Sequence, residues 1–370
     1  MASSGLNFVN LTPPNGAVQE LKELIFLSFV DAEGLGGLFN FMPGQQDGKK
    51  LGLIGQFGPL GAASQGCDPT YGNDLVATRE KTWSIKRWEI AEQICFTDLL
   101  STLAKTALKK KTQVADLTGT DYMDSILMPL LEEAAKRTVL RLALFGDPDA
   151  STYDKTTNST GTLKAGTDKK YFTVTAGLWK RIFEGVAIAA GTAGHITRVT
   201  VDANTKTTIA LQKAAIRTAG VATGILDDLI EDAPQNLRQA PNQIIYVTQA
   251  LADAVSRDIK KNNKGSELQW KSLFMGITET TYNGVTVRAI PFMDEIIQSY
   301  LQNTTNTDAW DKPYRAIYTI KDNLIIGSES ENELAEIETW FEKKDQKNYI
   351  LCRDTLGALI GDENLIAVAY

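Results

Sequence analysis

The chain has 370 residues, 43% of them apolar, and a formal net charge of −7. No stretch approaches the roughly 18 consecutive apolar residues of a membrane-spanning helix, so the composition excludes both a membrane protein and a largely disordered chain. Acidic and basic residues are interspersed, and the only compact basic run is the lysine triplet at 109–111. This pattern excludes the basic face that sequence-specific nucleic-acid binders carry.

Cysteine usage and the N-terminus indicate a chain made in the cytosol. Cys67, Cys95 and Cys352 are odd in number, far apart and without a C-x-x-C pair, which favours reduced thiols over a disulfide framework or a structural zinc site. The first eight residues lack the basic and apolar regions of a secretion signal. We therefore expect a cytosolic product.

The N-terminal part predicts an arm followed by an extended ribbon. Apolar residues at helical spacing predict a short helix over 17–32, ended by the glycines that follow. Between 44 and 96, glycines interrupt a thin apolar series, and such a segment has too few large side chains to build a core of its own. We expect the tryptophans of this ribbon to be exposed. Its missing half then lies on another subunit, which indicates assembly rather than catalysis.

The returning strand of the ribbon, 79–90, changes its pattern part-way. Trp83 and Ile85 share one parity, whereas Trp88 and Ile90 share the other. Successive side chains of a strand point to opposite faces, so this change predicts a β-bulge or a bend at residues 87–88.

The strongest helical pattern covers 120–146. A wide apolar face begins after a Thr-Asp start signal and ends at a Gly-Asp-Pro stop signal. Pro129 lies inside the pattern and predicts a kink. The polar residues at 151–170 predict a surface loop.

The remainder alternates helices and strands. Helices are predicted near 177–189, 206–220 and 248–260, with a buried strand at 244–247. An Asn-Gly pair at 283–284 predicts a two-residue hairpin turn, because it supplies the positive φ angles that such a turn requires. The later strands are expected at 316–320, 324–326, 337–341, 349–353 and 365–368. This order predicts an α+β fold with an antiparallel sheet completed by the C-terminus.

No set of residues predicts a catalytic, cofactor or metal site. The single histidine, His195, lies in a glycine-flanked loop without the partners of a catalytic set or of a two-histidine metal site. The glycine spacing at 161–168 resembles a phosphate loop but lacks its lysine and a preceding apolar strand. The acid-rich stretch 329–338 lacks the aspartate pattern of a calcium loop and fits a solvated surface. We therefore predict a protein that is not an enzyme and holds no cofactor.

Several short motifs occur in an order typical of one family. They are Glu20-Leu-Lys-Glu-Leu-Ile-Phe, Leu53-Ile-Gly-Gln-Phe-Gly-Pro-Leu-Gly, Cys67, Glu80-Lys-Thr-Trp83, Cys95-Phe-Thr-Asp98, the run 317–327, Trp340-Phe-Glu-Lys-Lys-Asp345 and Tyr349-Ile-Leu. With these motifs in this order, nearly the whole chain resembles the major capsid proteins of tailed bacteriophages, and most specifically those of phages that infect Bacteroides-like bacteria.

The resemblance implies the Hong Kong 97-like fold, an α+β fold with an N-terminal arm, an extended β-hairpin loop, a long spine helix, an axial lobe and a C-terminal antiparallel β region. The expected parts are the N-terminal arm at 1–45, the extended loop at 46–95, the spine helix and part of the peripheral domain with its surface loop at 96–175, the axial domain at 176–290 and the C-terminal β region of the peripheral domain at 291–370. Some relatives join subunits covalently through a lysine and an asparagine. No partner asparagine matches the lysines of the loop region, so we predict no cross-link.

The same resemblance implies the function. The chain is expected to be a structural major capsid protein that self-assembles, through hexamers and pentamers, into an icosahedral or prolate shell around the double-stranded DNA genome of a phage. Expected partners are scaffolding, portal and auxiliary capsid proteins and non-specifically packaged DNA, with no membrane. The expected location is the virion capsid, assembled in the cytoplasm of the host bacterium. The alternatives are an encapsulin-like compartment shell and, less well supported, an enzyme with an unrecognised site.

Overall fold

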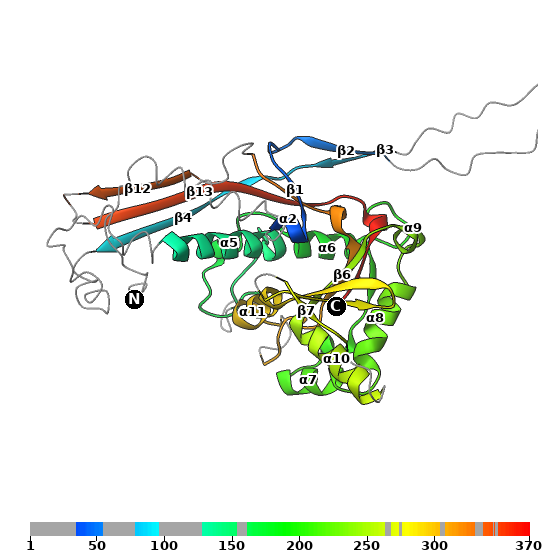
Figure 1. Cartoon of the computed structure of the whole chain (residues 1–370). Coiled ribbons are helices and arrows are strands. Elements are labelled where there is room, and N and C mark those ends of the chain that lie inside the picture. Colours follow the sequence, from blue (N-terminus) through cyan, green and yellow to red (C-terminus); the bar gives the residue numbers. More distant parts are fainter. Residues whose placement is uncertain are drawn as a thin grey trace, which may run out of the picture.

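The computed structural model describes residues 35–54, 78–95, 128–153, 161–262, 268–273, 276–303, 308–329, 336–342, 344 and 347–370. The molecule is elongated, with a body of helices and sheet at one end and a narrow sheet that extends from it (Figure 1). Three expectations lie outside the described residues: the helix at 17–32, the glycine-rich middle of the ribbon and the start of the long helix.

A seven-stranded mixed sheet forms the centre of the body. Its strand order is β5 (Thr197–Val199), β14 (Ile366–Ala369), β10 (Ala316–Ile320), β6 (Gln243–Thr248), β9 (Val285–Ile290), β8 (Thr278–Tyr282) and β7 (Lys271–Ser272). The pairs β5–β14 and β6–β9 are parallel, and the other neighbours are antiparallel. β8 and β9 form the predicted hairpin, with φ angles of 48° at Asn283 and 82° at Gly284 in its turn.

Helices cover both faces of this sheet, and β6 is buried on both sides, as predicted. Ile244 and Tyr246 belong to one hydrophobic core, whereas Ile245 and Val247 belong to the other. The helices that supply these cores are α5 (Met128–Phe145), α6 (Leu178–Ala187) and α11 (Pro291–Tyr300) on one face and α8 (Val221–Glu231) and α10 (Gln249–Asn262) on the other. The remaining short helices are α2 (Leu35–Leu38), α7 (Ile209–Ile216), α9 (Gln235–Gln239), η2 (Lys169–Tyr171), η3 (Asp202–Thr205), η4 (Lys321–Asn323) and η5 (Glu363–Leu365).

The helix predicted near 206–220 is present as the shorter α7, and a further helix that was not predicted, α8, follows it. Gly220 separates the two helices with a left-handed φ of 79°. The Asp258 carboxylate accepts hydrogen bonds from the backbone N–H groups of Gly220 and Thr223 and so satisfies the start of α8. The buried residues of α8 have helical spacing that the sequence analysis did not recognise; they are Ala222, Ile225, Leu226 and Leu229.

A second sheet, of five strands, links the body to the extension. Its central strand is β13 (Lys347–Ile360), which pairs with β12 (Glu336–Glu342), β4 (Lys86–Cys95) and β11 (Leu324–Gly327), and β11 pairs in parallel with β1 (Asn40–Met42). The C-terminal strands pair antiparallel with one another, as expected, but they divide between two sheets and do not complete a single one.

The long helix α5 packs against β13 through the first hydrophobic core, where Ala135, Val139 and Leu142 meet Ile350 and Cys352. Gly146 ends the helix, as predicted. A Cβ atom on Gly146 would lie 2.3 Å from the carbonyl oxygen of Thr175, so only glycine fits this crossing. The residues before Met128 lie outside the described part, and the kink at Pro129 stays a prediction.

Candidate assembly surfaces

The ribbon consists of β2 (Lys50–Ile54) and β3 (Thr78–Thr82), which pair only with each other among the described strands. Figure 1 shows this hairpin directed away from the body. Lys50 and Glu80 form an ion pair of 2.6 Å across it, and both side chains are more than 60% exposed. An exposed pair of this kind adds little stability. Among the described apolar residues of the hairpin, Leu51 packs, partly buried, against the small core of Trp83, Ile85, Ile325 and Leu359, so the ribbon contributes little to the core of its own subunit.

The root of the ribbon, defined as residues 47–49 and 81–86, is held firmly. The Asp47 carboxylate accepts hydrogen bonds from the Ile85 N–H at 3.0 Å and from the Lys86 ammonium at 2.8 Å. These bonds lower the pKa of Asp47, with the Lys86 hydrogen bond the largest cause. Lys81 forms an ion pair with Glu363 on η5. The hairpin thus has few contacts with the core, whereas its base is anchored to the body.

The root also explains the change of pattern in the returning strand. The β-bulge or bend expected at 87–88 is wrong in place, because Arg87 and Trp88 pair regularly with β13, and the interruption lies at residues 83–85, between β3 and β4. Trp83 and Ile85 pack on Ile325 and Leu359 in a small third core, whereas Trp88 belongs to the first core. The two cores lie on opposite faces of the sheet, because successive side chains of β11 and β13 point alternately to one face and the other.

The expectation of exposed tryptophans in the ribbon is likewise wrong for the described ones. Trp83 is 1% exposed and Trp88 is 3% exposed. Tertiary contacts from β11 and β13, which lie more than 200 residues later in the chain, provide this burial.

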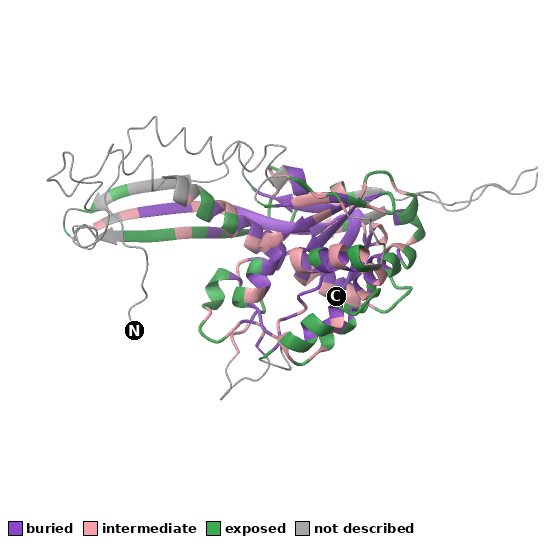
Figure 2. Cartoon of the chain, turned by 60° about the horizontal axis from the view of Figure 1, so that its bottom comes forward, coloured by how far each residue is buried: buried purple, intermediate pink, exposed green. Residues whose placement is uncertain are grey.

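The extension consists of β12, β13 and β4, and both β12 and β4 are edge strands among the described residues. Exposed residues predominate along β4, which carries Glu89 and Glu92 (Figure 2). Trp340 on β12 is 39% exposed and stacks on Tyr349 of β13, with ring centroids 5.3 Å apart. Charged side chains on an edge strand oppose pairing with strands of other chains. A contact on β4 therefore requires a partner whose surface is complementary to these charges.

The candidates for chemistry have structural roles where the structure describes them. His195 makes a 2.6 Å contact from Nδ1 to the carbonyl oxygen of Ile188 and closes the loop after α6. Cys352 is buried, and burial raises the pKa of its thiol to about 12, which leaves it unreactive. A Cβ atom on Gly161 would lie 2.3 Å from the backbone nitrogen of Tyr153, so this glycine allows a close backbone crossing.

Other candidates lie partly or wholly beyond the described residues. Cys67 and the lysines at 109–111 are outside them, as is much of the acid-rich stretch at 329–338. Within the described part of the chain, no three histidine, cysteine, aspartate or glutamate side chains gather as metal ligands. None of the described helices combines the length and the apolar character that crossing a membrane requires.

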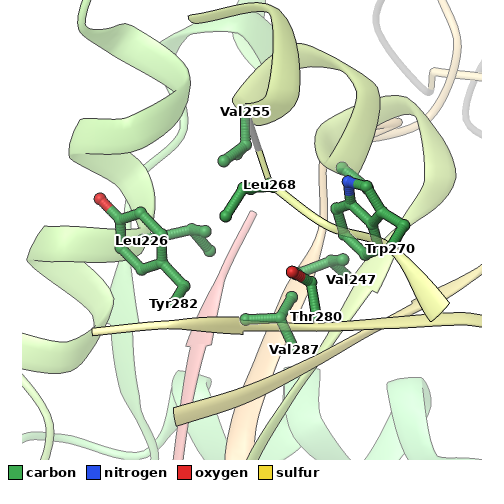
Figure 3. A pocket seen from close by; sticks show the side chains of 9 residues that line it. Leu226, Val247, Val255, Leu268, Trp270, Thr280, Tyr282 and Val287 are labelled. Carbon is green, nitrogen blue, oxygen red and sulfur yellow. The ribbon is translucent and has the colours of Figure 1, made fainter. Parts of the chain in front are cut away.

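A small apolar cavity lies in the second core, beneath α8 and α10 (Figure 3). Its volume is about 10 Å³. The residues that line it are Leu226, Val247, Ala252, Val255, Leu268, Trp270, Thr280, Tyr282 and Val287. A single water needs about 10–15 Å³ and two to four polar partners, so this cavity offers no ligand site.

A larger cavity of about 140 Å³ lies where α5 ends, and the buried Arg315 lines it. Its guanidinium donates to the Asp311 carboxylate at 2.8 Å and to the carbonyl oxygens of Lys312 and Asp311. Burial lowers the pKa of Arg315, and Asp311 opposes that shift. A buried charge paired in this way fixes the loop before β10 and serves the structure of the subunit.

Known proteins resemble this chain in fold but not in sequence. No family model matches the chain, and no curated protein matches it in sequence. The capsid of the native GTA particle matches with a TM-score of 0.53 at 10% identity, over 100% of this chain and 93% of that chain. The capsid of the empty GTA particle matches with a TM-score of 0.51 at 12% identity, over 92% of this chain and 89% of that chain. A chain of Gordonia phage Cozz matches with a TM-score of 0.50 at 12% identity, over 92% and 85%.

The chain has the capsid-protein fold. The α+β, Hong Kong 97-like fold expected from the sequence is thereby confirmed. The closer similarity to phages of Bacteroides-like bacteria stays a prediction. The sequence analysis did not find the anchored root of the ribbon, because part of the anchor joins distant residues: Lys81 pairs with Glu363, and Trp83 packs on Ile325 and Leu359.

Proposed function

We propose that the chain is the major capsid protein of a tailed phage, which assembles into an icosahedral or prolate shell around double-stranded DNA. The observation that carries the proposal is a capsid fold over the full chain combined with a ribbon that has no core of its own. A subunit that presents such a hairpin gains its remaining contacts from neighbours. The role is structural, without a catalytic site.

The parts of the chain take distinct roles in this proposal. Of residues 46–95, the part before β4 forms the extended loop that lies across a neighbouring subunit, whereas β4 stays in its own sheet, and α5 is the spine. Residues 176–290 form the axial domain around five-fold and six-fold positions. Residues 291–370 serve both domains, since β10 and β14 complete the seven-stranded sheet while β11 to β13 build the peripheral one.

The proposed partners are other copies of the chain, a scaffolding protein, a portal and auxiliary capsid proteins. The net charge of −7 fits loose, non-specific contact with packaged DNA rather than tight binding. The proposed location is the virion, after assembly in the cytoplasm of the host.

Sedimentation of the protein, produced alone and together with any scaffolding protein, tests the proposal. We expect particles of shell size, and we expect particles purified from infected cells to contain nuclease-protected DNA. Shells that hold a protein cargo and no DNA would favour the compartment alternative. A species that stays monomeric under assembly conditions would contradict both.

A further inference from the structure

A cavity of about 170 Å³ lies at the root of the ribbon, where four segments of the chain meet. One wall comes from the ribbon and a second from α6, while the loop after α6 and the region from β13 to η5 complete it. The residues that the argument uses are Lys81, Arg181, Glu184, Gly185, Leu359 and Glu363. A single water needs about 10–15 Å³, so this space is large enough for a small chemical group.

Arg181 on α6 is half-buried and lines this cavity, and none of the described residues pairs with it. The Nε atom of its side chain is buried and has no hydrogen-bond acceptor. No ion pair or side-chain hydrogen bond joins Arg181 to any residue that the structure describes. Burial lowers the pKa of this guanidinium, and the charge of Glu184 only partly opposes the shift. The side chain is half-buried, and its Nε–H is shielded from water without an acceptor, so an anion that enters the cavity would supply the acceptor that the described part of the subunit lacks.

The other charges of the cavity do not supply that anion. Lys81 and Glu363 form an ion pair with each other. The Glu184 side chain is 59% exposed and lies 3.9 Å from Lys180, outside ion-pair distance of Arg181. Arg315 shows how the same chain treats a structural arginine, because three acceptors from two residues surround that guanidinium. Arg181, which is half-buried where Arg315 is 1% exposed, has no such acceptors among the described residues.

The surroundings of Arg181 select the kind of anion. A guanidinium presents a planar fork of donors that matches the two oxygens of a carboxylate. A phosphate would bring nearly two negative charges beside Glu184 and Glu363, which also line the cavity. A carboxylate brings one charge, and the chain has 45 acidic side chains against 38 basic ones.

We propose that the cavity at the root of the ribbon takes a carboxylate side chain from a second copy of this chain when subunits assemble. The inference rests on the proposed shell function, because it is the ribbon beside this cavity that must meet a neighbour. The carboxylate of the neighbour pairs with Arg181, so each new contact turns an unpaired charge of the free subunit into a paired one. Arg181 then stabilises the contact between subunits and adds nothing to the stability of the free subunit.

The test compares Arg181→Gln and Arg181→Lys with Arg217→Gln, which removes the same charge from an exposed position at the end of α7. We expect Arg181→Gln to melt no lower than the wild-type subunit, while its shells require about tenfold or more protein to form. Arg181→Lys keeps the charge without the fork and should fall between. Arg217→Gln should match the wild type in both measurements. A lowered melting temperature of Arg181→Gln would show that Arg181 supports the subunit fold and would overturn the proposal.

Shell formation by the wild type and by Arg181→Gln distinguishes a failure of this inference from a failure of the proposed function. If the wild type forms shells and Arg181→Gln forms them at the same concentration, the inference is wrong and the shell function stands. If the wild type forms no shells, the proposed function itself fails. Melting in formate against chloride tests the source of the carboxylate. Suppose that formate raises the melting temperature of the wild type but not that of Arg181→Gln, while Arg181→Gln assembles normally. That result would show that the cavity binds a free carboxylate and would contradict a carboxylate from a second copy.

Discussion

The indole ring of Trp83 lies against Gly327, so closely that a Cβ atom on this glycine would sit 2.8 Å from two ring carbons. The glycine belongs to β11, and the tryptophan lies at the root of the ribbon. Because no side chain separates the two, the ring covers the outer face of the second sheet and fixes where the ribbon leaves the body.

Substitution of that glycine tests the contact. Gly327→Ala should lower the free energy of unfolding by about 1–3 kcal/mol, since the added methyl group must displace a fully buried ring. Gly52→Ala is the matched control, because a Cβ atom on Gly52 in the ribbon would meet no atom within 4 Å. Urea unfolding of the two variants measures the difference. Equal stability would contradict the packing described for the root.

Deletion of residues 50–80 with a short flexible linker should leave a folded subunit that no longer forms stable shells. The backbone of Lys49 accepts a hydrogen bond from the Trp83 N–H, so a short linker to Lys81 spans the gap and preserves the root. A loss of about 1–2 kcal/mol per subunit contact weakens each contact about five- to thirtyfold. Circular dichroism reports the subunit and sedimentation reports the shell. An unfolded subunit would show that the ribbon belongs to the core.

The cavity of Figure 3 predicts a stabilising substitution. The Thr280 hydroxyl faces apolar side chains and makes no hydrogen bond to any described residue. Thr280→Val should therefore raise the free energy of unfolding by up to about 1 kcal/mol. Thr319→Val is the contrasting control, because the hydroxyl of Thr319 donates to the Leu365 carbonyl oxygen at 2.7 Å. That variant should lose about 1–3 kcal/mol. A destabilised Thr280→Val would mean that the hydroxyl has a partner after all.

Stability should depend on pH through Asp354. Burial raises the pKa of this carboxyl group to about 7, although hydrogen bonds from Thr355 and Ser328 oppose the shift. The folded state therefore binds the proton more tightly than the unfolded state, whose pKa is near 3.8. Stability should fall as the pH rises from about 4 to about 7 and should stay level above that value.

The variant Asp354→Asn imitates the protonated carboxyl group. Its free energy of unfolding should therefore not fall between pH 6 and pH 7, as that of the wild type does. At pH 8 it should be more stable than the wild type by about 1–3 kcal/mol. Asp294, with its pKa raised by burial to about 6, preserves a slope below pH 6 in both proteins. Urea unfolding across pH 4–8 measures the curves, and parallel curves would contradict the assignment to Asp354.

His195→Ala should change little. The lost hydrogen bond to the Ile188 carbonyl oxygen belongs to a surface loop, and such losses cost less than about 1 kcal/mol. Shell formation should equal that of the wild type in sedimentation. Loss of assembly in this variant alone would reveal a functional role for the histidine.

Local signals in the sequence predicted much of the fold. The Asn-Gly pair at 283–284, the apolar run of β6 and the glycine after α5 each act through neighbouring residues, and the structure agrees with all three. These elements need no distant contact to be recognised.

Other elements depend on distant contacts and were missed. The break at residues 83–85 arises because Trp83 and Trp88 enter cores on opposite faces of a sheet built from the C-terminal part of the chain. β13 runs beyond 349–353 because Asp354 and Thr355 find hydrogen bonds to Ser328 inside the fold, although their polarity suggests an end of the strand. The missing partner of Arg181 is a property of three-dimensional packing and leaves no trace in sequence.

Electron microscopy of the purified full-length protein, with its scaffolding protein if assembly requires one, tests the central claim most directly. The account predicts closed shells of uniform size in which the ribbon of each subunit lies on a neighbour. Monomers or open tubes under all assembly conditions, from a subunit that melts cooperatively, would contradict it.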